Sequence, residues 1–115
     1  MSNDAFVTRM VRDHVMHVEL GSRLDNSNAP AMLKLISDEL SEGVQFIILD
    51  CANVELMSSA GVGSILGSVE SLRQNNGDIV LCNLSDQARR VLEVLDLLDY
   101  LTVKPTSQEA DAHCN

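Results

Sequence analysis

Residues 44–67, which read VQFIILDCANVELMSSAGVGSILG, predict how the chain folds more directly than any other stretch. The first part, Val44 to Leu49, is a short, nearly continuous apolar run rich in β-branched residues. Such a run is typical of a strand that is covered on both faces, and Asp50 follows at its carboxyl end. From Ala60 to Leu72 the apolar residues recur at helical spacing. The stretch therefore predicts a buried strand, a loop and then a helix.

The N-terminal side of this stretch predicts a hairpin and a further helix. Residues 6–20 alternate apolar and polar side chains, which indicates a strand or hairpin with one solvated face and a turn near Asp13-His14. Residues 21–28 are predicted to form a polar loop. The helix that follows is expected to be capped by Asn28 and to end at Gly43. Its apolar residues share one helical face: Ala29, Met32, Leu33, Ile36 and Leu40.

The C-terminal side repeats the alternation of strand and helix. Ile79 to Cys82 indicates a second buried strand, and Ser85 is placed to cap a helix whose apolar face runs from Ala88 to Leu98. Residues 100–103 are predicted to form a last short strand. Strands that alternate with helices imply right-handed crossovers and a largely parallel sheet. We therefore expect an α/β fold with a mixed, mostly parallel sheet of four to five strands and about four helices.

Length and charge favour one acidic binding domain. Residues 1–115 suit a single domain, with a core at about residues 6–103 and a polar C-terminal tail at 104–115 that has room for one more helical turn. Eight basic and seventeen acidic residues give a formal net charge of −9, which disfavours nucleic acid and anionic membranes as partners. The chain start resembles no signal peptide, and no apolar run approaches the ~18 residues of a membrane span. A cytoplasmic protein without membrane insertion is expected.

The glycines beside the serines do not form a nucleotide-binding loop. Gly61, Gly63 and Gly67 are spaced as G-x-G-x-x-x-G, which misses the dinucleotide fingerprint by one residue and lies too far from the preceding strand. Packing explains them better: Gly63 and Gly67 would let the helix approach a neighbour closely. Gly61 would leave the backbone bare beside the serines.

Catalytic and metal-binding patterns are incomplete. A serine nucleophile needs a general base within reach, and no such pairing is indicated for the three histidines, His14, His17 and His113. His113 and Cys114 lack further metal ligands and are interpreted as solvated tail residues. No C-x-x-C spacing joins the three cysteines, which are expected to be reduced thiols: Cys51, Cys82 and Cys114. We predict no catalytic residue, no metal site and no cofactor.

Ser58 and Ser59 lie where the loop after the central strand gives way to a helix. One of them is expected to be the N-cap, and two hydroxyls that satisfy free backbone N–H groups would explain the pair without further function. A helix N-terminus also favours anionic groups, so a phosphate on Ser59 would be tolerated there. It would add nearly two negative charges to the surface. The residues alone leave both interpretations open.

Two segments carry a family resemblance. GSRLDNSNAPAML at 21–33 and FIILDCANVELMSSAGVGSILGSVESLRQNNGDIVLCNLSDQARRVLEVLDLLDYL at 46–101 resemble STAS domains, the sulfate transporter and anti-sigma factor antagonist family. The resemblance extends from about Val15 to Val103 and implies a STAS-like fold. In the antagonist branch, a serine in this motif is phosphorylated by a partner kinase that is also the anti-sigma factor. The motif match identifies that serine as Ser59, and the phosphoryl group would break the complex by charge and bulk.

The resemblance also implies a docking surface and a partner. Asp25 is expected to lie near the serine, and the implied contact residues are Asp25, Ser58, Ser59, Ala60, Gly61 and Gly63. The expected partner is an anti-sigma factor and serine kinase of the GHKL type, with a phosphatase as a second candidate. Ser58 stands where many antagonists have aspartate, and Ala60 where they have serine or threonine. Other members act without phosphorylation, so an accessory subunit of a lipid-transport complex or a signalling scaffold is the alternative function.

Overall fold

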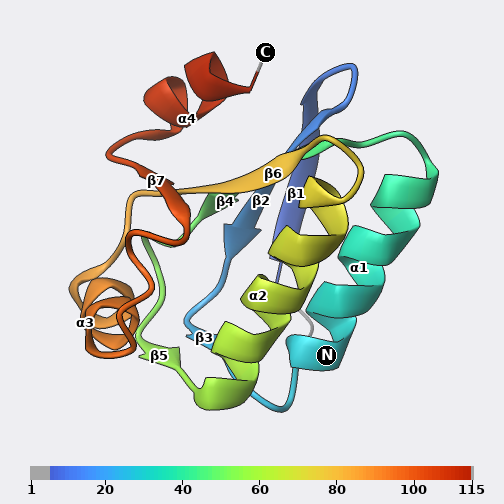
Figure 1. The fold of residues 1–115 in the computed structure, drawn as a ribbon. Coiled ribbons are helices and arrows are strands. Elements are labelled where there is room, and N and C mark those ends of the chain that lie inside the picture. The colour runs from blue at the N-terminus through green and yellow to red at the C-terminus, as the bar shows by residue number, and fades with distance from the viewer. Residues whose placement is uncertain (1–5, 115) are drawn as a thin grey trace.

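The computed structural model describes residues 6–114 and shows a five-stranded sheet with helices on both faces (Figure 1). Along the sheet the order is β1-β2-β4-β6-β7, with β1 antiparallel to β2 and every other neighbouring pair parallel. The bounds of these strands are Phe6–Arg12 (β1), Val15–Leu20 (β2), Phe46–Asp50 (β4), Asp78–Cys82 (β6) and Thr102–Lys104 (β7). The predicted α/β fold with a mixed, mostly parallel sheet is confirmed. The assignment of 1–115 to one domain includes residues 1–5 and 115, which lie outside the described residues.

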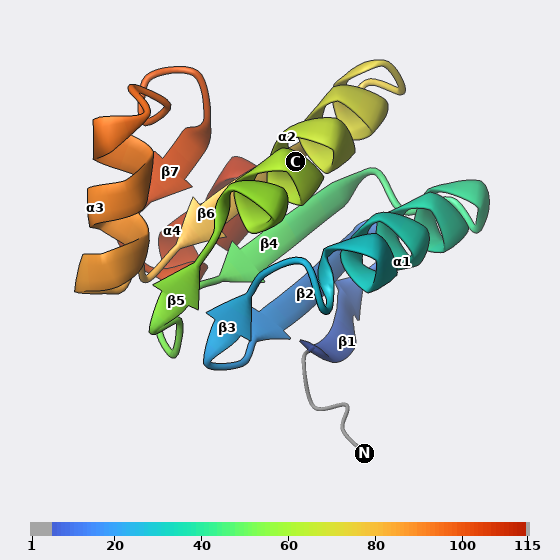
Figure 2. The same ribbon diagram turned by 90° about the horizontal axis from the view of Figure 1, so that it is seen from below.

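Helices cover the sheet unequally. The four helices of residues 6–114 are α1 (Ala29–Ser41), α2 (Ser59–Arg73), α3 (Asp86–Val94) and α4 (Ser107–His113). Figures 1 and 2 show α1 and α2 side by side across one face, with α4 on the opposite face and α3 beside β5. Because β2, β4, β6 and β7 run in parallel, their carboxyl ends lie at the same end of the molecule. The helix α2 also begins at this end.

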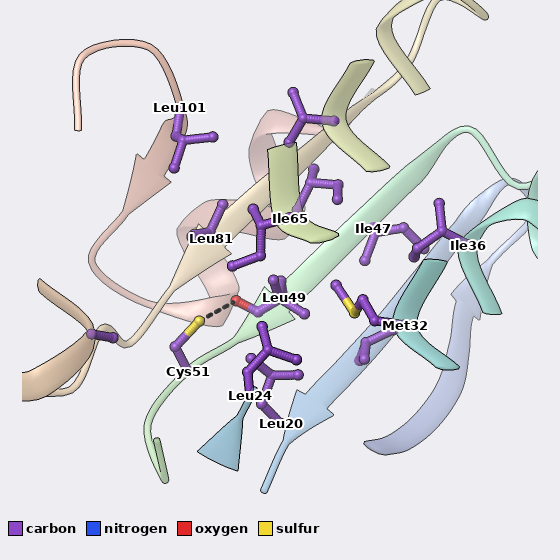
Figure 3. Close-up of a cluster of buried hydrophobic side chains, with 14 of the residues drawn as sticks. Leu20, Leu24, Met32, Ile36, Ile47, Leu49, Cys51, Ile65, Leu81 and Leu101 are labelled. Atoms are coloured by element: carbon purple, nitrogen blue, oxygen red, sulfur yellow. Dashed lines mark hydrogen bonds between the residues drawn. The ribbon is translucent and has the colours of Figure 1, made fainter. Parts of the chain in front are cut away.

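The central strand β4 shows why both faces need cover. Its residues alternate between the two faces, as the pleat of a strand requires. Ile47 and Leu49 pack under α1 and α2, together with side chains such as Met32 and Ile65 (Figure 3). Ile48, between them, belongs to a second buried cluster on the other face. The continuous apolar run of this strand is thus explained by burial on both sides.

The C-terminal segment forms the helix for which the expected tail had room, but it covers the sheet, so the interpretation of Cys114 as a solvated residue was wrong. Ala110 and Cys114 are buried in the cluster that contains Ile48. The Arg12 guanidinium of β1 donates hydrogen bonds to the Asp111 carboxylate and to the Cys114 carbonyl, which ties this segment to the hairpin. The core therefore extends beyond residue 103. The segment is so short that its few apolar residues formed no recognisable period.

Two short strands were not predicted. β3 (Arg23–Leu24) lies inside the segment expected to be a polar loop, and it pairs in parallel with β5 (Leu56–Met57). Strands of two residues are too short to show an alternating pattern. The pair forms a separate ladder beyond the ends of β2 and β4 (Figure 2).

The third helix is shorter than its apolar spacing suggested. α3 ends at Val94, although helical spacing continues to Leu98. Asp96 takes a φ of 59°, and the N–H of Leu97 donates to the carbonyl of Leu92 at 2.9 Å. This is the hydrogen bond of a Schellman motif, which stops a helix by turning the chain through a left-handed residue.

A buried hydroxyl on α2 gives a stability prediction. Ser68 is 1% exposed, and its Oγ has no hydrogen-bond partner within residues 6–114. Ser64 is also buried, but its hydroxyl donates to the Gly61 carbonyl at 2.7 Å. An unpaired buried hydroxyl costs free energy that alanine does not. We expect Ser68→Ala to raise the free energy of unfolding by about 1 kcal/mol more than Ser64→Ala does.

Urea denaturation of the two variants measures this difference. Both replace serine by alanine inside the same helix, so the gain in helix propensity cancels between them. Equal changes for the two variants would show that the Ser68 hydroxyl is satisfied in solution.

Candidate functional site

The β3–β5 ladder places the start of α2 against the chain that follows β3. Arg23 pairs with Leu56 and Leu24 pairs with Met57, and the N–H of Ser58 extends the ladder by donating to the Leu24 carbonyl at 3.0 Å. Leu24 and Met57 are buried, whereas Arg23 and Leu56 are exposed. Because successive strand residues point to opposite faces, the ladder has one core-facing and one solvent-facing side. The solvent-facing side adjoins the first turn of α2.

The two serines have different roles. Ser58 is the N-cap of α2, and its Oγ accepts a hydrogen bond from the Gly61 N–H at 3.3 Å. Ser59 is the first residue of the helix and is exposed. Within residues 6–114 the Ser59 hydroxyl has no hydrogen-bond partner. The expectation that one serine caps the helix is confirmed for Ser58, which leaves Ser59 with a free, accessible hydroxyl.

Gly61 is required by the close approach of α2 to β3. A Cβ atom at this position would lie 2.3 Å from the carbonyl oxygen of Leu24 and 2.9 Å from its carbonyl carbon. Neither backbone atom can move away without shifting the ladder. Gly61 is buried, so it does not bare the backbone as expected but instead sets the distance between helix and ladder.

The packing interpretation holds for one of the other two glycines. At Gly67 a Cβ would lie 3.3 Å from a Leu33 methyl carbon of α1, so this residue does lie close to a neighbouring helix. At Gly63 a Cβ would meet nothing within 4 Å, and the residue is exposed. The prediction that Gly63 serves close packing was wrong, because this residue lies on the open side of the helix.

Ser59, Ala60 and Gly63 share one open surface. All three are exposed, and residues three or four apart on a helix are surface neighbours. Their side chains are a hydroxymethyl group, a methyl group and a hydrogen atom, so the helix backbone is accessible there. Leu56, which is 44% exposed, adds an apolar side chain from the ladder. We call Leu56, Ser59, Ala60 and Gly63 the Ser59 face.

Asp25 lies next to the ladder but is turned away from solvent. It is 7% exposed, and its Oδ1 accepts hydrogen bonds from the backbone N–H and the hydroxyl of Ser27. The Ser27 hydroxyl, assisted by its N–H, lowers the pKa of Asp25, which is therefore ionised at neutral pH. The Asn28 side chain accepts from the Asp25 N–H at 2.9 Å. Asn28 thus orders this turn and, contrary to expectation, its side chain makes no cap bond to α1.

Comparison with known proteins identifies the family. The family model described as STAS domain matches residues 7–110. The chain belongs to the STAS domain family. The anti-sigma-B factor antagonist of Staphylococcus aureus is 27% identical to this STAS domain over 92 residues, which are 80% of this chain and 85% of that protein.

Solved structures agree with this assignment. The anti-sigma factor antagonist SpoIIAA in its unphosphorylated form is 26% identical, with a TM-score of 0.82 and coverage of 94% of this chain and 95% of that one. The phosphorylated form of SpoIIAA from Bacillus has a TM-score of 0.75 at 26% identity, covering 94% and 98% of the two chains. These relatives are named as anti-sigma factor antagonists, which are non-enzymatic regulatory proteins, and this STAS domain belongs with them.

The helix end of the STAS domain is electrostatically open to an anion. The first turn of α2 contains no acidic residue, and the N-cap is a neutral serine. Helix N-termini carry partial positive charge from N–H groups that lack intrahelical partners. A phosphoryl group on Ser59 would meet no acidic side chain within the first turn of α2.

Other chemistry finds little support in the part of the chain that the structure describes. No group of three or more His, Cys, Asp or Glu side chains could hold a metal ion within residues 6–114. All three cysteines are free and buried, and burial raises the pKa of Cys82 to about 12 and that of Cys114 to about 11. Thiols of this kind are packing residues at neutral pH. Over the same residues, no helix is long and apolar enough to cross a membrane.

Two residues of the site were missed from sequence. Arg23 and Leu56 lie side by side on the solvent-facing side of the β3–β5 ladder, just ahead of α2, only because the two short strands pair. A charged residue and an exposed leucine in loops carry no signal of their own. The one available clue was the position of Arg23 in the RLD triplet that includes Asp25.

Proposed function

We propose that this STAS domain is an anti-sigma factor antagonist that binds an anti-sigma factor with serine kinase activity through the Ser59 face. Phosphorylation of Ser59 switches the binding off. The observation that carries the proposal is the division between the serines: Ser58 caps the helix, whereas the Ser59 hydroxyl is exposed and free. The relatives named as anti-sigma factor antagonists, one of them solved in a phosphorylated form, support this choice.

The chemistry requires only an accessible hydroxyl from this chain. The Ser59 oxygen attacks the γ-phosphorus of ATP, the bond from that phosphorus to the oxygen of the departing ADP breaks, and the hydroxyl proton passes to a base of the kinase. Positioning and Mg²⁺ come from the kinase. The STAS domain therefore needs no cofactor or catalytic residue of its own.

Each expected contact residue has a defined role in the proposed docking surface. Ala60 and Gly63 offer a flat helix surface that a partner backbone can approach closely. Ser58 and Gly61 fix the geometry of the helix start from below. Asp25 has little exposed area, so it acts mainly by ordering the adjoining loop. We place this switch in the cytoplasm, where the anti-sigma kinase and its opposing phosphatase act.

A phosphorylation assay tests the assignment. Incubation with the serine-kinase anti-sigma factor of the same genome and ATP-Mg²⁺ is expected to add one phosphate, located on Ser59 by peptide mass spectrometry. Ser59→Ala should abolish the modification. Ser58→Ala is the matched control: it loses the cap, at a cost of about 1 kcal/mol, and should still be phosphorylated below its melting temperature. Phosphate on Ser58, or phosphate that persists in Ser59→Ala, would refute the proposal.

A further inference from the structure

The ladder beside Ser59 suggests how the modified state is held. We propose that Arg23 is the intramolecular partner of a phosphoryl group on Ser59, and that it leaves Asp25 to bind that group. This inference rests on the proposed function, since it concerns the phosphorylated form of the same site. It assigns a role in holding the phosphoryl group to Arg23, which lies on β3 and not on α2.

The backbone brings Arg23 within reach of Ser59. Arg23 and Leu56 are partners on the solvent-facing side of the ladder, and the Ser58 N–H bonds to the carbonyl of Leu24. Paired strands lie about 4.8 Å apart. Ser59 is three residues beyond Leu56, and strand residues rise about 3.3 Å each, so the Cα atoms of Arg23 and Ser59 are about 11 Å apart. An extended arginine side chain and a phosphoseryl side chain can together span this gap. The Arg23 side chain already extends toward this end of the ladder, because its Nη1 lies 3.5 Å from an Asp25 oxygen.

Arg23 can change partner at little cost. Its side chain is 61% exposed, and the ion pair with Asp25 is long. An ion pair with so exposed an arginine and so long a contact contributes little to stability. Asp25 retains the two hydrogen bonds from Ser27 when Arg23 departs. No buried carboxylate is left without a partner, so the exchange avoids the penalty that follows the loss of a buried ion pair.

Charge favours the exchange. The chain already carries a formal net charge of −9, and the phosphoryl group adds nearly two further negative charges close to the ionised Asp25. Arg23 is the one basic residue among residues 21–33 and 50–67. Lys34 is already paired with Asp38 and Arg73 with Asp78. A guanidinium also matches phosphate oxygens with two parallel donors.

The test uses protein in which phosphoserine is incorporated at position 59 during synthesis, so that the phosphate is present without any kinase. Titration by ³¹P NMR gives the second pKa of the phosphate. We expect this pKa to be lower in the parent protein than in Arg23→Gln, by about 0.2–0.7 pH unit at low salt. The difference should shrink at about 1 M salt. Arg23→Lys should be intermediate, because it keeps the charge but loses the planar pair of donors.

Arg9→Gln is the matched control, because Arg9 is an exposed arginine on β1, outside the ladder. It should leave the phosphate pKa unchanged. The Nε–H resonance of Arg23 should also shift between the serine and phosphoserine forms. Equal phosphate pKa values in the parent and Arg23→Gln, or an unmoved Arg23 resonance, would overturn the inference. Failure of the kinase assay would instead refute the proposed function, so the two results remain separate.

Discussion

Gly61→Ala is expected to lower the free energy of unfolding by about 2–3 kcal/mol, whereas Gly63→Ala should raise it by up to about 1 kcal/mol. A Cβ at Gly61 would lie 2.3 Å from the Leu24 carbonyl oxygen, so α2 or β3 must shift. At Gly63 the space is open, and alanine removes the conformational freedom of glycine from the unfolded chain.

Chemical denaturation of the two variants and the parent protein measures both changes. The pair is closely matched, since each variant adds one methyl group in the first half of the same helix. Changes of equal sign and size would contradict the structure, because they would mean that α2 does not approach the ladder at Gly61. A destabilised Gly61→Ala should also bind its partner poorly, since the start of α2 would be displaced.

Phosphorylation of Ser59 is expected to weaken binding to the anti-sigma factor by about 100-fold or more. The group places nearly two negative charges and considerable bulk on a face built from small side chains. The phosphate should not destabilise the fold, because a helix N-terminus favours an anion and the first turn of α2 holds no acidic residue. The phosphorylated protein should therefore melt at the same temperature as the unmodified protein or higher.

The main elements could be predicted from sequence because the apolar residues of each form a clear pattern. β4 and β6 are continuous apolar runs, and α1 and α2 have long apolar faces. The prediction failed for short elements, because a few residues are not enough to show a pattern. The ladder residues of β3 and β5 show no period, and α4 covers the second face of the sheet with few apolar residues. The end of α3 was misplaced because a left-handed Asp96 stops the helix while the apolar spacing continues.

A candidate site was predicted from sequence, but its internal arrangement was not. The position of Ser58 and Ser59 before a helical pattern was enough to predict a cap and an accessible hydroxyl. Which serine serves which purpose depends on the Ser58–Gly61 hydrogen bond. Likewise, only the proximity of Leu24 separates Gly61, which must be glycine, from Gly63, which need not be. A contact between segments that are far apart in the sequence cannot be predicted from the residues next to either glycine.

Calorimetric titration of the purified anti-sigma factor with three forms of this protein tests the phosphorylation switch directly. The forms are the unmodified protein, the Ser59-phosphorylated protein and Ser59→Ala after the same kinase treatment. We predict tight binding of the first and third forms and a dissociation constant about 100-fold higher, or no detectable heat, for the second. Melting curves show that the phosphorylated form is folded. Equal affinity of the phosphorylated and unmodified forms would contradict the switch at Ser59.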